Sequence, residues 1–138
     1  MQIEEFAESD QPAVIALWRR CNLLRPWNDP EKDIARKLKV QREMFLVGKI
    51  DAHVVATVMG GYDGHRGWVN YLAVDPPHQR RGLARAMMDE VTRRLTALGC
   101  PKINLQVRDD NLEAIEFYEA IGFARDRAIS MGKRLIAD

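Results

Sequence analysis

The chain has 138 residues, of which 46% are hydrophobic and 30% charged, and its formal net charge is +1. This length suits one compact domain with a hydrophobic core, so we expect a single domain over residues 1–138. The small net charge provides no global field that would favour nucleic acid or a membrane surface, so binding is expected at a local site.

Cysteine usage and the N-terminal residues favour a cytoplasmic location. Cys21 and Cys100 lie far apart, and Glu4 and Glu5 interrupt any apolar run that a signal peptide would need. No apolar stretch approaches the roughly 20 residues that cross a bilayer. We therefore expect a cytoplasmic protein with no membrane partner.

The N-terminal residues predict an edge strand followed by a helix. The strand is expected at residues 2–6, and Ser9 or Asp10 can cap a helix that begins next to it. Four apolar side chains of this helix recur at helical spacing and should face the core. They are Val14, Leu17, Trp18 and Cys21.

A second helix is expected over residues 31–40, because Asp29 can cap it and Pro30 suits its first position. Asp29 is also a candidate for substrate contact. Trp27 is apolar in a segment that otherwise has loop composition. It either packs against the sheet or forms one wall of a substrate pocket.

Three strands should follow, at residues 44–49, 53–59 and 68–74. The connection at residues 60–67 contains four glycines and more polar side chains than a hairpin needs. These side chains are Tyr62, Asp63, His65 and Arg66. Two interpretations stay open: the glycines relieve backbone strain, or the polar groups contact an acceptor substrate, with Tyr62 and His65 among the binding residues.

Residues 79–84 join the last of these strands to a long helix. Gly82 stands where that helix opens, with the small Ala84 beside it. The first N–H groups of a helix lack partners and carry partial positive charge, so an anion can bind a backbone made accessible by glycine. Arg80 and Arg81 add positive charge. The alternative is that Gly82 only makes a strand-to-helix turn and the arginines are solvated.

The helix after Gly82 has an apolar stripe that includes Met87, Met88 and Leu98, and Gly99 should end it. A strand is expected at residues 102–107, and a last helix begins at a cap provided by Asp110 or Asn111. Residues 123–135 predict one or two final strands. This order is typical of an α/β or α+β domain around one mixed sheet.

Two motifs in this order resemble the GCN5-related N-acetyltransferases (GNAT family). Residues 79–84, QRRGLA, fit the acyl-coenzyme A loop (Q/R)xxGx(G/A), and the later helix fits NxxAxxFYexxGF. The second motif is formed by Asn111, Ala114, Phe117, Tyr118, Glu119, Gly122 and Phe123. The strings RPWNDP and GGYDGHRG also resemble the small bacterial YpeA-like subfamily. The resemblance implies one mixed, mostly antiparallel sheet of six to seven strands, flanked by about four helices.

The resemblance also implies acetyl-coenzyme A as the donor substrate. The backbone of the strand before the loop would face the pantetheine arm, at Leu72, Ala73 and Val74. The pyrophosphate would lie on the loop and the helix start, at Gln79, Arg80, Arg81, Gly82, Leu83, Ala84 and Arg85. Asn111 matches a position that often contacts the coenzyme arm.

The activity implied is direct transfer of acetyl to a primary amine of a small molecule, peptide or protein. Tyr118 matches a tyrosine near the sulfur; a phenol with a pKa of about 10 can protonate the leaving thiolate and stay neutral at pH 7. The alternative for Tyr118 is an ordinary core aromatic. Many relatives carry a glutamate base on the strand before the loop, but this chain has none at residues 68–71. Asp63, Asp29 or a water chain would take its place, and Asp63 is the first candidate.

A second hypothesis is a regulatory module that binds acyl-coenzyme A and has lost efficient transfer, which the missing glutamate permits. The histidines and cysteines show no ligand spacing, so no metal is expected. The arginines are local and balanced by acids, so no nucleic acid is expected. The sequence leaves open the acceptor amine and whether the chain forms a homodimer.

Overall fold

The computed structural model describes residues 1–138 and divides into two compact units, Met1–Leu105 and Gln106–Asp138. The first unit contains one sheet with the strand order β1-β2-β3-β4-β5. These strands are β1 (Gln2–Glu5), β2 (Phe45–Ile50), β3 (His53–Tyr62), β4 (Gly67–Val74) and β5 (Ile103–Leu105). Strands β1 to β4 pair antiparallel, and β5 pairs parallel with β4. The sheet is mixed and mostly antiparallel, as predicted, but it has five strands rather than six or seven.

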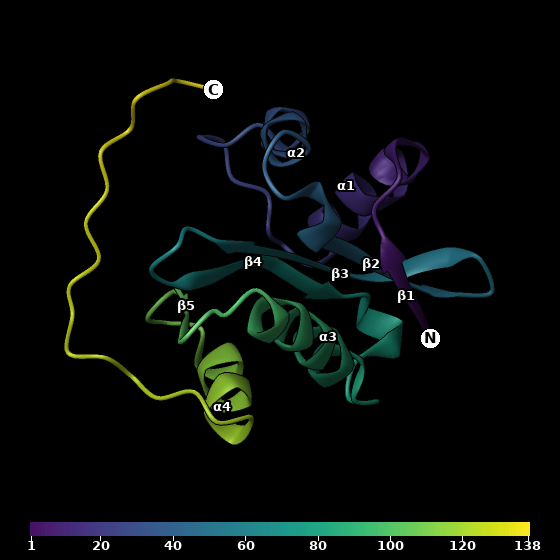
Figure 1. Ribbon diagram of the computed structural model, residues 1–138. Helices are drawn as coiled ribbons and strands as arrows, with labels where there is room; N and C mark the ends of the chain where they lie inside the picture. The colour runs from purple at the N-terminus through teal and green to yellow at the C-terminus, as the bar shows by residue number, and fades with distance from the viewer. The chain divides into compact units, whose positions relative to one another are not determined.

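Three helices of the first unit cover the two faces of this sheet. They are α1 (Gln11–Arg20), α2 (Pro30–Lys37) and α3 (Leu83–Ala97). Helices α1 and α2 lie over one face, and α3 lies over the other (Figure 1). With α4 of the second unit, this confirms the predicted α/β class and helix number. No helix is both long and apolar enough to cross a membrane.

The core between α1 and the sheet is aromatic. Phe6 stacks on Phe45 with ring centroids 4.3 Å apart, and the ring centroids of Trp18 and Phe45 are 6.2 Å apart. The α1 positions predicted to face the core do so: Val14, Leu17 and Trp18 are fully buried, and Cys21 packs half-buried at the edge of this cluster. Burial of these large apolar side chains is the main source of stability for this face.

Helix α2 begins as predicted but is shorter. The Asp29 carboxylate accepts the N–H groups of Glu31 at 2.9 Å and Lys32 at 3.3 Å, which is the expected cap. The helix ends at Lys37, because the following residues tighten into a turn that reaches Gln41 in the left-handed region, with φ +49°.

The glycine-rich connection is shorter than the predicted range of residues 60–67. Strand β3 continues to Tyr62 and β4 begins at Gly67, so the turn comprises only residues 63–66. A Cβ placed on Gly60 would lie 2.4 Å from Cγ2 of Val91 in α3. Gly60 is therefore a strand glycine that lets a helix approach the sheet, and a loop assignment from composition alone was wrong there.

Helix α3 begins after Gly82 and is followed by Gly99, which has a φ of +84° and ends it as predicted. Its methionines, Met87 and Met88, are buried. Leu98 was expected on the same buried stripe, but its side chain is 49% exposed. It lies beyond the last helical turn, along a shallow surface groove.

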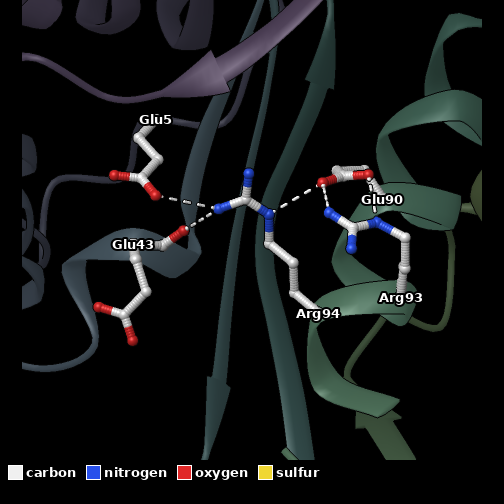
Figure 2. Close-up of polar contacts among 5 residues, drawn as sticks. All are labelled: Glu5, Glu43, Glu90, Arg93 and Arg94. Carbon is white, nitrogen blue, oxygen red and sulfur yellow. Dashed lines mark hydrogen bonds and ion pairs between the residues drawn. The ribbon is translucent and has the colours of Figure 1, made fainter. Parts of the chain in front are cut away.

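Arg94 joins α3 to two distant parts of the first unit (Figure 2). Its guanidinium donates to Glu90 at 2.9 Å, to Glu5 at 3.3 Å and to the main-chain oxygen of Glu43 at 2.8 Å. Arg93 also binds Glu90, with Nη2 2.6 Å from Oε1. Hydrogen bonds from Arg93 and then Arg94 lower the pKa of Glu90 to about 2.

We expect Glu90→Gln to lower the free energy of unfolding by about 1 kcal/mol at pH 7, because surface ion pairs are screened by water and salt. A carboxylate with a lowered pKa stabilises the fold above its unfolded value, near 4.5, and loses this contribution as the pH falls towards 2. Urea unfolding at pH 7 and pH 2.5 should therefore show a difference between the proteins that shrinks with acid. Asp89→Asn, an exposed change on the same helix, is the control; an equal loss there would contradict the assignment.

The second unit contains α4 (Leu112–Ala120). The Asn111 side chain accepts the N–H of Ala114 at 3.2 Å, and Gly122, with φ +103°, follows the helix end. Helix and caps match the prediction. The strands expected at residues 123–135 are absent. A strand needs a hydrogen-bonded neighbour and a surface for alternate side chains, but here Ile129 and Met131 are each 90% exposed. The single domain over residues 1–138 stays a prediction.

Candidate active site

A bulge interrupts β4 in the middle of the sheet. Thr57 of β3 lies opposite Ala73, whereas Met59, two residues on, lies opposite Asn70, three residues back. Two residues of β4 therefore face one residue of β3. One of them, Tyr71, has a φ of +53°, in the left-handed region. Bulges of this kind bend a strand and redirect its main-chain groups.

The part of β4 after the bulge has an unpaired edge. Strand β5 pairs only with the first three residues of β4, up to Val69, so residues 72–74, beyond the bulge, have no strand partner on that side. The N–H of Asp75 donates to Val55 of β3 at 2.8 Å. Since main-chain groups of a strand alternate in direction, those of Val74 and Leu72 point to the unpaired side. An extended ligand with amide groups can add to such an edge.

The loop that follows ties itself to the end of this strand. The Gln79 side chain donates to the main-chain oxygen of Val74 at 3.0 Å, and the Cys21 thiol lies 3.3 Å from the same oxygen. Burial, followed by the nearby Asp75 charge, raises the pKa of the Cys21 thiol. Gln79 therefore closes the loop through its side chain. The thiol of Cys21 is protonated at neutral pH.

The start of α3 presents free N–H groups to solvent. Gly82 precedes the helix with a φ of +79° and no side chain caps it; its carbonyl accepts the first intrahelical bond, from Ala86 at 3.0 Å. Arg80, also left-handed at +63°, makes the loop turn towards the helix. The first three residues of the helix are Leu83, Ala84 and Arg85. Their N–H groups lack intrahelical partners and carry partial positive charge. A Cβ built on Gly82 would meet no atom within 4 Å.

These two features fit different parts of one elongated ligand. The edge at Leu72 and Val74 can bind amides, and the helix start at Leu83 can bind an anion. Arg80, Arg81 and Arg85 are exposed around the helix start, where their charges can reach an anion. The loop and helix-start residues predicted to bind the pyrophosphate therefore follow the strand residues, 72–74, predicted to face the pantetheine arm.

Asp63 lies in the turn between β3 and β4 and is bound on both carboxylate oxygens. Oδ1 accepts the N–H groups of Arg66 at 2.7 Å and His65 at 2.8 Å, and Oδ2 accepts the Trp68 indole at 3.3 Å. The Arg66 bond, then the His65 bond, lowers the pKa of Asp63. At about 3.3 Å per residue, the start of β4 lies roughly 13 Å from the bulge at Tyr71.

The other predicted substrate residues lie in two places. Tyr62 ends β3 and His65 lies in the turn that follows; the Tyr62 hydroxyl donates to the main-chain oxygen of Gly64 in that turn at 3.2 Å. Trp27 and Asp29 belong to the connection between α1 and α2. The indole of Trp27 is 51% exposed, so it is not buried against the sheet.

Residues that the sequence did not single out hold the end of β3. Gln41 accepts the N–H of Tyr62 at 2.8 Å and donates to its carbonyl at 3.0 Å, as a neighbouring strand would. The Lys37 ammonium donates to the carbonyl of Gly60. Burial lowers the pKa of Lys37. No sequence pattern signals these contacts, because they depend on where α2 ends.

Tyr118 belongs to the second unit. Its ring contacts Phe117 and Phe123 edge-on, with centroids 5.1 and 5.6 Å apart. Burial raises the pKa of the Tyr118 phenol to about 12, so the hydroxyl keeps its proton over the physiological range. The side-chain oxygen of Asn111, predicted to contact the coenzyme, is used in this structure to cap α4.

Comparison with known proteins identifies the family. A family model described as the acetyltransferase (GNAT) family matches residues 6–123. The chain belongs to the GNAT family of acetyltransferases. A protein named as an acetyltransferase, from Pectobacterium atrosepticum, is 50% identical over 138 residues, covering the whole chain and 98% of that relative.

Solved structures have the same GNAT fold. The ribosomal-protein-S18-alanine N-acetyltransferase of Escherichia coli is 26% identical with a TM-score of 0.75, over 91% of this chain and 78% of that one. AAC(6')-Iy, solved with the bisubstrate analogue CoA-S-monomethyl-acetylneamine, is 18% identical with a TM-score of 0.76, over 96% and 97% of the two chains. The family establishes acetyl transfer as the class of reaction.

Proposed function

We propose that this GNAT protein is an acetyl-coenzyme A-dependent N-acetyltransferase, which transfers acetyl directly to a primary amine of a small molecule, peptide or protein. One observation carries the proposal: the unpaired edge of β4 is followed, after the loop at residues 75–82, by the uncapped start of α3. Coenzyme A has its binding groups in the same order, since its pantetheine arm contains amides and ends in a pyrophosphate.

In this proposal the pantetheine arm lies along residues 72–74, with its amides on the main-chain groups of Leu72 and the N–H of Val74, since the Val74 carbonyl already accepts from Gln79. The pyrophosphate accepts hydrogen bonds from the N–H groups at the start of α3, and Arg80, Arg81 and Arg85 supply mobile positive charge. Asn111 stays a candidate for contact with the arm. Support also comes from AAC(6')-Iy, whose solved complex contains a coenzyme A bisubstrate analogue.

The proposed reaction needs no covalent enzyme intermediate. The amine nitrogen attacks the thioester carbonyl carbon, a C–N bond forms, and the C–S bond breaks with its electron pair going to sulfur. Tyr118 donates its hydroxyl proton to the leaving thiolate and regains one from solvent. A phenol whose pKa is raised to about 12 keeps that proton at neutral pH.

The proton that the amine loses has three candidate acceptors: Asp63, Asp29 and a water chain. An alkylamine with a pKa near 10 costs about 4 kcal/mol to deprotonate at pH 7. Both carboxylates already accept two main-chain N–H groups. Asp63 also has a lowered pKa, which makes it a weaker base. Of the three, these contacts favour the water chain.

Asp63→Asn tests this choice, because an asparagine oxygen can still accept the N–H groups of His65 and Arg66 and keep the turn. We expect kcat to stay within about three-fold of wild type, with an unchanged pH dependence, if water accepts the proton. The measurement is kcat between pH 6 and pH 9. A fall of about 100-fold or more, which is the size of a lost general base, would instead make Asp63 the base.

The function itself is tested by two assays on the purified chain. Thiol release from acetyl-coenzyme A is measured with a panel of amines that includes small molecules, peptides and folded proteins. Calorimetry measures binding of acetyl-coenzyme A without an acceptor. We expect binding together with turnover on at least one amine. Binding with no turnover on any amine would favour the regulatory module, and no binding would refute both.

A further inference from the structure

Thr57 is a polar residue in the middle of an apolar strand. Its side chain is fully buried in β3. The hydroxyl accepts the indole N–H of Trp18 at 2.9 Å and donates to the main-chain oxygen of Tyr71 at 2.8 Å. Both hydrogen-bonding roles of the hydroxyl are therefore used, and one of its partners is the bulge residue of β4.

Tyr71 is held at two further points. Its ring stacks on the indole of Trp18 with centroids 3.8 Å apart, and its hydroxyl donates to Asp33 of α2 at 2.7 Å. A residue other than glycine seldom adopts the left-handed backbone of Tyr71, so its surroundings must hold it there. Contacts from α1, α2 and β3 converge on this one position.

The bond from Thr57 sets the direction of a neighbouring N–H group. The carbonyl of Tyr71 and the N–H of Leu72 belong to one planar trans peptide, in which they point in opposite directions. When the carbonyl is directed to Thr57, the N–H of Leu72 is directed away from Thr57. Leu72 is one of the two residues whose main-chain groups belong to the unpaired edge.

We propose that Thr57, with Trp18 and Asp33, positions the Tyr71–Leu72 peptide so that the edge of β4 is ready to bind the coenzyme arm. This inference rests on the proposed function. The three residues are positioning residues, since each of them acts on the edge through its contact with Tyr71. The network explains why a hydroxyl is buried at a place where valine would fill the same space in the core.

The test is Thr57→Val, which keeps the shape of the side chain and removes the hydroxyl. We expect the Kd for acetyl-coenzyme A, measured by calorimetry, to rise about ten-fold, the change that corresponds to one oriented hydrogen bond. Thr57→Ser restores the hydroxyl and should return the Kd to within two-fold of wild type. Tyr71→Phe keeps the stacked ring, removes the hydroxyl that donates to Asp33 and should raise the Kd about three-fold.

Phe6→Leu is the matched control for a general loss of stability. Phe6 is buried in the same core cluster but follows β1, at the opposite edge of the sheet from β5. Phe6→Leu should lower Tm by about as much as Thr57→Val does and leave the Kd for acetyl-coenzyme A within two-fold of wild type. The amide NMR spectrum of the apo protein adds a readout free of the ligand: Thr57→Val should shift the Leu72 amide resonance, because the Tyr71–Leu72 peptide changes its orientation, and Phe6→Leu should leave this resonance unchanged.

The outcomes separate the two proposals. If the wild-type chain binds no acetyl-coenzyme A, the proposed function fails, and this inference with it. If the wild-type chain binds but Thr57→Val and Tyr71→Phe bind equally well, only the inference is overturned. An equal loss of affinity in Phe6→Leu would also overturn it, because the effect would then be one of stability. Where Thr57→Val does not fold, Tyr71→Phe decides.

Discussion

Tyr118→Phe should lower kcat about 100-fold and leave the Kd for acetyl-coenzyme A within two-fold of wild type. A 100-fold fall in kcat is the size expected for loss of a general acid. The Kd should hardly change, because the ring and its contacts with Phe117 and Phe123 remain. Steady-state rates of thiol release provide kcat, and calorimetry provides the Kd. Since burial raises the pKa of Tyr118 to about 12, the wild-type rate should show no decline from tyrosine ionisation up to pH 10.

The control for this substitution is Phe117→Leu, which disturbs the same aromatic cluster and keeps the hydroxyl. We expect its kcat to stay within about three-fold of wild type. If Tyr118→Phe turned over as fast as wild type, Tyr118 would be a core aromatic, which is the alternative that the sequence left open. Equal losses in both variants would point to packing of α4 and not to proton transfer.

Gly82→Ala should raise the KM for acetyl-coenzyme A about ten-fold or more with little change in kcat. The φ of Gly82 is +79°, and a left-handed backbone costs a residue with a Cβ about 1–2 kcal/mol. An alanine therefore favours a different backbone at the helix start and turns the N–H groups away from the anion. Initial rates at varied acetyl-coenzyme A, with a saturating acceptor, measure both constants.

Gly99→Ala is a closely matched control, because Gly99 lies just beyond the other end of α3 with a φ of +84°. Neither glycine has an atom within 4 Å of a built Cβ, so the backbone strain is alike in the two variants. Gly99→Ala should reduce stability by a similar amount and keep the KM. Equal KM values in the two variants would remove the helix start from the donor site.

The sequence predicted the elements whose causes are local. Asp29 and Asn111 cap the helices that follow them, and Gly82 precedes α3, because the partners of these residues lie within four positions along the chain. Periodicity placed Val14, Leu17 and Trp18 in the core correctly. Composition failed at Gly60, which lies in a strand, because the side chain that excludes a Cβ there, Val91, belongs to α3.

By itself the sequence determined the family and the caps of α2 and α4, since each depends on residue types at short spacing. The tertiary structure alone decided how the edge of β4 is shaped. Thr57 reaches Tyr71 across 14 positions, and Tyr71 reaches Asp33 across 38. Such contacts have no local signature, because strand register and helix placement bring their partners together. The same reason applies after α4, where strands were predicted at residues 123–135 but no neighbouring strand pairs with these residues.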